Sequence, residues 1–342
     1  MVTAAASNDA PLGGLVVVVT GGSAGIGRAT VCAFARRGAC IGVLARGREG
    51  VLAACREAEQ LGGEAIALVA DVADPAAVEA AAAEVEQRWG RIDVWVNNAM
   101  ATIYAPVDQI GDADFRRATD VTYLGAVWGT RAALARMRPR GRGVVVQVGS
   151  ALAYRSIPLQ APYCAAKAAL RGFTDSLRSE LIHEGSAVRL TMVQLSAFNT
   201  PQFDWGRSVM PCKAQPVLPV FQPELAAAAI VHAALHARRE WWVGWPAVKA
   251  IVAQRLMPGV LDRLLARQGW QGQQSDEPRD PRAPDNLHAP VPGDPGAHGR
   301  FDAVARRHSV QWWLSVRRGP VIAIALALLA LLAAAAALLV RR

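Results

Sequence analysis

A tyrosine and a lysine four residues apart, Tyr163 and Lys167, are the side chains of this sequence best suited to moving a proton. Only three of the 37 basic residues are lysine, so a lysine at this spacing is notable. On a helix, residues i and i+4 share one face. An ammonium there stabilises a phenolate and lowers the tyrosine pKa from about 10. We predict a proton-transfer pair, although the same spacing also arises by chance in many helices.

A glycine-rich turn between an expected strand, 15–19, and an expected helix, 28–37, indicates a phosphate site. Glycines let the backbone approach a pyrophosphate, whose charge is favoured at a helix N-terminus. The spacing T-G-x-x-x-G-x-G, directly after the first strand, is more specific than an isolated glycine turn. The candidate cofactor contacts in this turn are Thr20, Gly21, Ser23, Gly25, Ile26 and Gly27.

Polar residues follow the other expected strands, at 40–44, 65–70, 92–96 and 143–148. Ligands of open α/β sheets bind outside the carboxyl ends of the strands. Read singly, each of these residues could also be a cap or a turn residue. The residues concerned are Arg46, then Asp71 and Val72, then Asn98 and Ala99, and finally Ser150.

Arg46 bears on the choice of cofactor. Dinucleotide-binding folds often place an acid near this point to bind the ribose 2′-OH, whereas arginine suits a 2′-phosphate. The acid is absent here, and Ser23 offers a second contact. We therefore expect NADP (NADPH), with NAD less favoured; the alternative is that Arg46 is an ordinary surface arginine.

Together these motifs resemble the short-chain dehydrogenase/reductase family over about residues 12–265. The resemblance implies an α/β fold, a Rossmann-like doubly wound parallel sheet in a single catalytic domain, with strand order 3-2-1-4-5-6-7. It implies that Tyr163 is the general acid or base and that Lys167 lowers its pKa and binds the nicotinamide ribose. Ser150 would hydrogen-bond the substrate oxygen, and Thr200 would bond the carboxamide.

Three positions depart from the family pattern. Thr122 stands where an asparagine often helps to hold a proton-relay water, and a threonine hydroxyl could serve instead. Met100 replaces a glycine after Asn98 and Ala99. Leu195 and Ser196 replace a Pro-Gly pair. The Ser150, Tyr163 and Lys167 set is intact, so we expect an active enzyme.

The ends of the chain differ in character. Residues 1–12 are expected to be a flexible N-terminus, 13–267 the catalytic domain, 268–300 a Pro/Gly-rich linker, and 301–319 a juxtamembrane segment. Residues 321–340 are all Val, Ile, Leu or Ala, long enough to cross a bilayer core of about 30 Å. We predict a C-terminal transmembrane helix over 320–340, with Trp312 and Trp313 at the membrane interface. A buried core helix is the poorer alternative.

The net charge of +9 lacks the aromatic-interleaved basic stripe of a nucleic-acid site, so no specific nucleic acid is expected. Basic residues beside an apolar tail fit an anionic membrane surface, and their excess before the span places the catalytic domain on the cytoplasmic side. Five scattered cysteines indicate free thiols. A homo-oligomer is plausible from the family resemblance.

The sequence thus predicts a membrane-anchored NADP(H) oxidoreductase that acts on a hydrophobic carbonyl or alcohol. The region after Thr200 would line a lipophilic pocket or simply pack as a lid, through Phe203, Trp205, Val209, Met210 and Phe221. The alternative function is a catalytically idle, nucleotide-binding scaffold at the membrane. The segment 298–302, His-Gly-Arg-Phe-Asp, has the look of a motif, but no mechanism is assigned to it.

Overall fold

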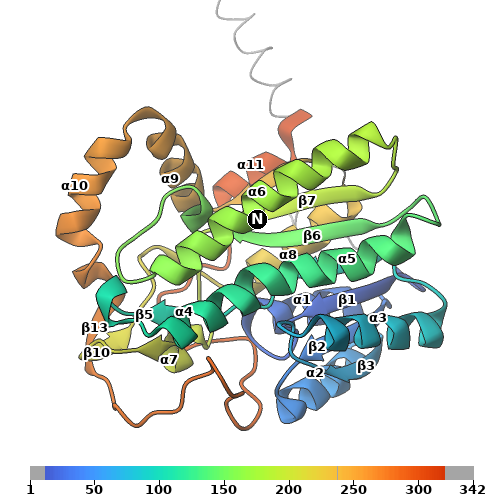
Figure 1. Cartoon of the computed structure of the whole chain (residues 1–342), viewed down its shortest axis with the longest axis horizontal. Helices are drawn as coiled ribbons and strands as arrows, with labels where there is room; N and C mark the ends of the chain where they lie inside the picture. Colours follow the sequence, from blue (N-terminus) through green and yellow to red (C-terminus); the bar gives the residue numbers. More distant parts are fainter. Residues whose placement is uncertain (1–11, 237, 320–342) are drawn as a thin grey trace, which may run out of the picture.

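The computed structural model describes residues 12–236 and 238–319. Its centre is a seven-stranded parallel sheet in the spatial order β12–β7–β6–β4–β1–β2–β3 (Figure 1). Numbered along the chain, this is the predicted order 3-2-1-4-5-6-7, so the fold prediction is confirmed. The strands are β1 (Val16–Thr20), β2 (Cys40–Ala45), β3 (Glu64–Val69), β4 (Val94–Asn97), β6 (Val144–Ser150), β7 (Arg189–Leu195) and β12 (Glu240–Val243).

The sheet is apolar on both faces, as parallel sheets usually are. Successive side chains of a strand point to opposite faces. In β1, Val17 and Val19 therefore enter one hydrophobic cluster while Val16 and Val18 enter the other. Each face must consequently be covered by helices.

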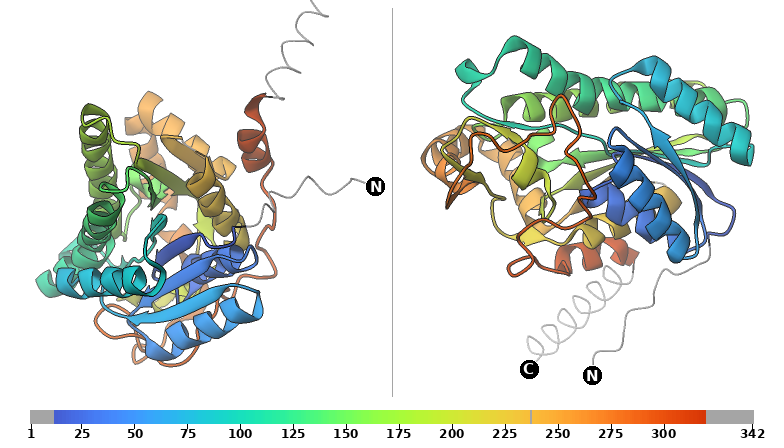
Figure 2. Two further views of the ribbon diagram at one scale, coloured as in Figure 1. Left: turned by 90° about the vertical axis from the view of Figure 1, so that its right-hand side faces the viewer. Right: turned by 90° about the horizontal axis from the view of Figure 1, so that it is seen from below.

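Two layers of helices cover these faces (Figure 2). The cluster around Val17 contains side chains from α1 (Gly25–Ala35), α2 (Arg48–Gln60), α8 (Pro223–Leu235) and α11 (Val310–Val316). The cluster around Val18 contains side chains from α3 (Pro75–Trp89), α4 (Asp112–Thr119), α5 (Gly125–Met137) and α6 (Ala161–His183).

Local sequence signals set the ends of α3. The Asp74 carboxylate accepts hydrogen bonds from the amides of Ala76 (2.8 Å) and Ala77 (3.3 Å), which are otherwise unpaired at a helix start. Pro75 at the first position is compatible with this start because it has no N–H to satisfy. Gly90 ends the helix with φ 76°, a conformation that glycine adopts without strain.

A π-helical turn, η2 (Asp120–Leu124), joins α4 to α5 in one continuous helical run. Such turns are rare and are often found at functional sites. This one carries Thr122 and lies beside the loop that follows β4, because the Thr122 hydroxyl is bonded to Ala101.

The shorter elements gather at and beyond the edge of the sheet that the carboxyl ends of its strands form. Three two-stranded sheets pair β5 with β9, β8 with β11, and β10 with β13. Their bounds are β5 (Ile103–Tyr104), β8 (Ala197–Phe198), β9 (Arg207–Ser208), β10 (Cys212–Ala214), β11 (Val220–Phe221) and β13 (Gln274–Pro278). The remaining helices are α7 (Gln202–Trp205), α9 (Trp245–Leu256) and α10 (Pro258–Gln268).

The segment expected to be a linker, 268–300, differs from that expectation. It contains β13, paired antiparallel with β10, and it continues along the body of the domain (Figure 2). The side chain of Leu287 is fully buried. The expectation from composition fails here because proline and glycine disfavour helices and long strands, but they do not prevent a segment from packing on a surface that offers hydrogen-bond donors.

The juxtamembrane expectation also needs correction at one residue. Trp312 is 8% exposed and packs edge-on against Trp241 at 5.6 Å, so it belongs to the core rather than to a membrane interface. Trp313 is exposed. Within residues 12–236 and 238–319 no helix combines the length and the apolar character needed to cross a bilayer. The predicted span, 320–340, lies outside the described residues.

Candidate active site

Ser150, Tyr163 and Lys167 meet at the carboxyl edge of the sheet. Ser150 is the last residue of β6, in register with Leu195 of the neighbouring β7. Its hydroxyl accepts a hydrogen bond from the Leu152 amide (3.1 Å), which fixes the turn that leaves the strand. Tyr163 and Lys167 lie one turn apart in the first half of α6.

The Lys167 ammonium is buried and has a defined partner. It donates a hydrogen bond to the Val148 carbonyl (2.7 Å) and lies 5.7 Å from the centre of the Tyr163 ring. Burial disfavours the charged form and lowers the pKa of Lys167 from 10.5 to about 8. A compact charge is therefore held directly beneath the tyrosine.

The pKa of Tyr163 departs from the sequence-based expectation. Burial raises this pKa above its ordinary value of 10, and a hydrogen bond with Ser150 opposes the rise only in part. The predicted lowering of the Tyr163 pKa is therefore not seen in this structure, because desolvation of the phenolate dominates. The phenol is protonated at neutral pH, which is the form needed to donate a proton.

The glycine turn has the close approaches that a dinucleotide site needs. Gly21 has φ +65°, and a Cβ on Gly27 would lie 2.0 Å from the Gly21 carbonyl oxygen, so only glycine fits there. The Thr20 hydroxyl accepts hydrogen bonds from the amides of Asn98 (2.9 Å) and Ala99 (3.1 Å). Thr20 and Gly27 thus shape the site rather than face the cavity.

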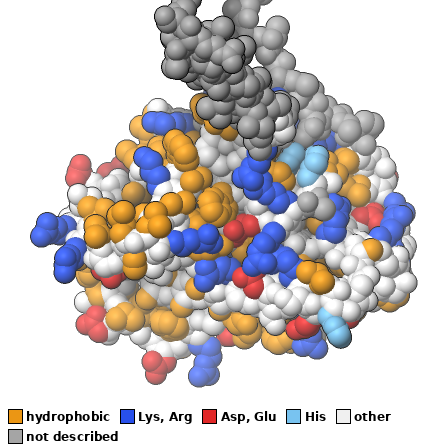
Figure 3. All heavy atoms as spheres, turned by 90° about the horizontal axis from the view of Figure 1, so that it is seen from above, with side chains coloured by type: hydrophobic (Ala, Val, Ile, Leu, Met, Phe, Trp, Pro, Cys, Tyr) orange, Lys and Arg blue, Asp and Glu red, His pale blue; other side chains and the backbone are white. Residues whose placement is uncertain are grey.

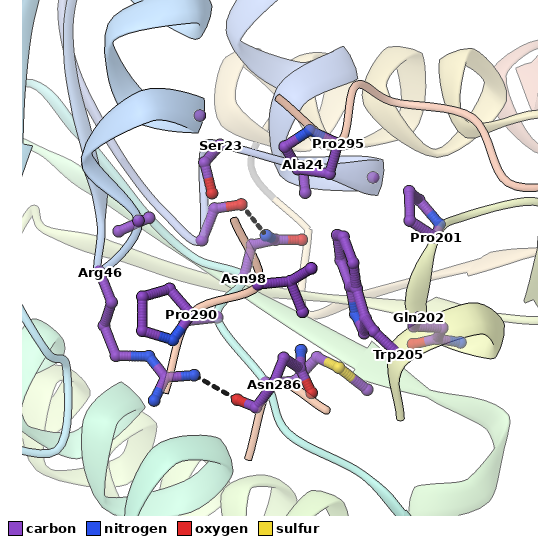
Figure 4. A pocket seen from close by; sticks show the side chains of 18 of the residues that line it. Ser23, Ala24, Arg46, Asn98, Pro201, Gln202, Trp205, Asn286, Pro290 and Pro295 are labelled. Atoms are coloured by element: carbon purple, nitrogen blue, oxygen red, sulfur yellow. Dashed lines mark hydrogen bonds between the residues drawn. The ribbon is translucent and has the colours of Figure 1, made fainter. Parts of the chain in front are cut away.

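Most of the predicted cofactor residues line one cavity of about 190 Å³ (Figure 4). They come from the carboxyl ends of β1, β2, β3 and β4 and from the loop after β7. The predicted residues in its lining are Gly21, Ser23, Gly25, Ile26, Arg46, Asp71, Val72, Asn98, Ala99 and Thr200. The structure therefore brings these positions together as expected for a nucleotide trough.

The same cavity is lined by residues that the sequence did not suggest, among them Asn286, Pro290 and Pro295. Figure 4 shows Arg46 reaching toward Asn286, with Pro290 beside it. The guanidinium donates to the Asn286 carbonyl and to the carbonyls of Leu287 (3.2 Å) and His288 (3.1 Å). Arg46 thus faces the site as predicted, but its guanidinium donates to backbone carbonyls of the segment 268–300 that was expected to be a linker.

Arg28 was also missed by sequence reasoning. It is almost fully buried and donates to Glu57 (2.6 Å), to the Gly50 carbonyl (3.2 Å) and to Asp294 (3.2 Å). It therefore ties α1 to α2 and to the segment above them. No local sequence signal announces this role, because all three partners are at least 22 residues away.

Thr122 is placed by its hydrogen bonds as a positioning residue. Its hydroxyl accepts from the Ala101 amide (2.9 Å) and donates to the Ala101 carbonyl (3.1 Å). A hydroxyl has one proton, and here that proton is used within the protein. The Thr122 hydroxyl therefore has no proton left to donate to a relay water. Its two hydrogen bonds connect the π-helical turn to the loop after β4.

The apolar residues after Thr200 go to four different places. Phe203 and Met210 are buried together with Tyr104 and Leu159 in a small cluster beside the catalytic edge. Phe221 packs against Phe198 in the main core, so it does not face a substrate. The two others also differ, since Trp205 lines the nucleotide cavity and Val209 is exposed.

Comparisons with known proteins agree with this geometry. A family model described as short chain dehydrogenase matches residues 15–206. The oxidoreductase YxnA of Bacillus subtilis is 32% identical over 277 residues, which cover 80% of this chain and 77% of YxnA. The oxidoreductase SadH of Mycobacterium tuberculosis is 31% identical over 261 residues, covering 74% of this chain and 94% of SadH.

Solved structures show the same likeness. A short-chain dehydrogenase from Streptomyces avermitilis is 30% identical, with a TM-score of 0.60 over 74% of this chain and 96% of that one. An alcohol dehydrogenase from the archaeon Thermococcus sibiricus, solved with 5-hydroxy-NADP, is 26% identical with a TM-score of 0.58, over 67% and 95%. The chain therefore belongs to the short-chain dehydrogenase family and is an oxidoreductase of that type.

Proposed function

We propose that this protein is a membrane-bound, NADP(H)-dependent oxidoreductase that interconverts a lipophilic carbonyl compound and its alcohol. The proposal is carried by the grouping of Ser150, at the end of β6, with Tyr163 and Lys167 of α6, together with the cavity that the glycine turn lines. When bound, the nicotinamide cofactor supplies or accepts the hydride.

The three side chains have separate roles in this proposal. Tyr163 donates a proton to the substrate oxygen during reduction and takes it back during oxidation. Ser150, at hydrogen-bonding distance from Tyr163, binds the same oxygen as negative charge develops on it. Lys167 places a positive charge under the phenol and favours the phenolate left after proton transfer.

The preference for NADP(H) rests on Arg46. This guanidinium points into the cavity, and Arg117 adds a second positive charge close to it. The position directly after β2 holds Arg46 rather than an acidic residue that would bind a ribose 2′-OH. Two guanidinium groups suit a phosphate, which forms strong charge-assisted hydrogen bonds with arginine.

Membrane binding and a lipophilic substrate are supported by the apolar run 321–340 and by an exposed apolar face. Figure 3 shows hydrophobic side chains gathered with basic ones on the upper face of the molecule. On α9 and α10, Leu256 is 72% exposed, Val260 57% and Leu264 43%. Such a surface marks a binding site for a protein or a membrane, and the apolar run 321–340 in the sequence favours the membrane. The excess of basic residues before that run favours a catalytic domain on the cytoplasmic side.

The full chain in detergent tests this function by consumption of NADPH and NADH with a panel of hydrophobic ketones and aldehydes. Tyr163→Phe should lower kcat by about 10²–10⁴, the usual contribution of positioned acid–base catalysis. Tyr123→Phe is the matched control, because that ring packs against Phe173 and an apolar cluster away from the proposed proton transfer. Arg46→Ala should lower the NADPH over NADH selectivity at least tenfold. Tight nucleotide binding without any Tyr163-dependent turnover would instead support the idle scaffold.

A further inference from the structure

The stretch 286–296, here called the strap, crosses the nucleotide cavity between two fixed ends. On its N-terminal side, β13 pairs with β10. Arg279, just after β13, donates from its amide to the Pro211 carbonyl (2.9 Å) and from Nε to the Met210 carbonyl (3.0 Å). This end is therefore attached to the catalytic domain through the backbone.

The C-terminal end is held by the motif 298–302. Asp302 accepts hydrogen bonds from Asn199 (2.8 Å) and Gln222 (3.0 Å), and His298 bonds both Asp302 (2.8 Å) and Glu224 (2.7 Å). Arg300 pairs with Asp204, while the Phe301 ring packs edge-on against Phe203 at 5.6 Å. The motif thus acts as an anchor, and the strap is the span between the two anchors.

At one end of the cavity, backbone carbonyls of the strap accept hydrogen bonds from the donors that are expected to bind the 2′-phosphate of the nucleotide's adenosine ribose. Three successive carbonyls, at 286–288, accept hydrogen bonds from Arg46. Arg117 donates to the Leu287 carbonyl as well (3.0 Å) and also pairs with Asp71. Leu287 is fully buried in the cluster that includes Val72.

At the other end the strap uses the start of α1, where a pyrophosphate is expected. The Gly25 amide, first in the helix, donates to the Gly296 carbonyl (3.0 Å). Asp294 pairs with Arg28 (3.2 Å), and the Gly293 amide donates to Glu49 (2.6 Å). Carbonyl dipoles therefore occupy phosphate-directed donors at two separate points of the trough.

The space left beneath the strap is small. The cavity measures about 190 Å³, whereas pockets that enclose drug-sized ligands measure roughly 300–1,000 Å³. A dinucleotide is at least as large as such ligands, so it requires the strap to move. The closed strap also has a cost, because Asn286 Oδ1 is buried without a hydrogen-bond partner among the described residues.

We propose that the strap is an intramolecular competitor of the dinucleotide, occupying Arg46 and the Gly25 amide until nucleotide binding displaces it. Phosphate oxygens are stronger acceptors for arginine than neutral carbonyls are, so a nucleotide with a 2′-phosphate displaces the strap most effectively. Binding is weakened by the fraction of molecules in which the strap is closed. The inference rests on the proposed dinucleotide site.

Hydrogen exchange on the full chain in detergent tests this directly, with NADPH as the probe. Saturating NADPH should accelerate exchange of the amides in 286–297 at least tenfold, while those of β13 stay unchanged. Slower exchange in 286–297 would mean that the strap closes over the nucleotide as a lid, and that outcome, like an unchanged rate, would overturn the proposal.

Binding kinetics give a second, independent test. Replacement of 286–296 by a Gly/Ser stretch of equal length should raise the NADPH association rate constant at least tenfold and lower Kd accordingly. Ala289→Ser is the control, since Ala289 is exposed within the strap. For the replacement variant, a faster NADPH dissociation rate with an unchanged association rate would contradict the role of the strap as a competitor.

The two proposals fail in distinguishable ways. If wild type binds NADPH but the replacement changes neither rate, only this inference fails. If neither chain binds NADPH or NADH, the proposed function fails with it.

Discussion

Lys167 holds a charged group inside the protein, and this has a cost in the free enzyme. Lys167 is 3% exposed, and its ammonium donates a hydrogen bond to the neutral carbonyl of Val148. Burial of an ammonium without a carboxylate partner is unfavourable, which is why its pKa falls to about 8. This cost fits the proton-transfer role proposed for Lys167, because active sites commonly trade stability for function.

We expect Lys167→Met to stabilise the free enzyme, most strongly at neutral pH. Between the folded pKa near 8 and the unfolded pKa of 10.5, the unfolded chain binds more protons, so wild-type stability rises with pH. The stability advantage of Lys167→Met over wild type should therefore shrink by about 2 kcal/mol between pH 7 and pH 9.5. Urea unfolding in mild detergent at the two pH values measures it, and a gap that does not change with pH would contradict the burial argument.

The anchor 298–302 connects one histidine to two carboxylates. Burial lowers the pKa of His298, but hydrogen bonds to Glu224 and Asp302 outweigh this and raise the pKa above 6.5. The imidazolium is the form that both carboxylates favour. The anchor is therefore stabilised by protonation, and its strength depends on pH.

A pH dependence of this anchor follows from the sign of the shift. Because the folded pKa of His298 is raised, its stabilisation is fully present below about pH 6.5 and is lost as pH rises through the higher folded value. His298→Gln keeps a polar side chain without the charge. The difference in Tm between wild type and His298→Gln should be largest at pH 6 and should vanish near pH 9. A difference that grows with pH would show that the carboxylates do not stabilise a protonated histidine.

At the scale of the molecule, one surface stands out for its exposed apolar side chains. No residue of α10 is buried, and Leu256 and Met257 at the junction with α9 are exposed as well. Arg263 and Arg267 lie on the same helix. α11, close to where the described chain ends, lies at the same upper edge of the molecule in Figure 1. An amphipathic, basic surface in a chain that also carries the apolar run 321–340 suits an anionic bilayer.

A chain that ends at residue 319 should therefore still bind vesicles that contain phosphatidylserine, and should bind neutral vesicles less well. Leu256→Glu should reduce this binding at least tenfold, because it places a charge in the apolar face. Ile182→Glu is the matched control: Ile182 on α6 is 73% exposed, against 72% for Leu256. Sedimentation with vesicles measures the bound fraction, and equal losses for the two variants would exclude α9–α10 as the contact.

The sequence by itself predicted the parallel sheet, and through the family that its motifs resemble it predicted the strand order that the structure has. Four consecutive valines predict a strand buried on both faces, as in β1, and Gly27 is required because its Cβ would meet the Gly21 carbonyl. Tyr163 and Lys167 share a helix face by spacing alone. These features depend on neighbours in the chain or on strand ends that the fold class already aligns, so they can be read locally.

Only the tertiary structure decided what fills the trough and how the site is tuned. Arg46 donates to backbone carbonyls about 240 residues away. Every residue type carries the same backbone carbonyl, so no sequence pattern could mark these partners. The raised pKa of Tyr163 depends on how much of the phenol is desolvated, which follows from packing rather than from the Tyr-Lys spacing. Trp312 was likewise placed by Trp241, a partner on a distant strand.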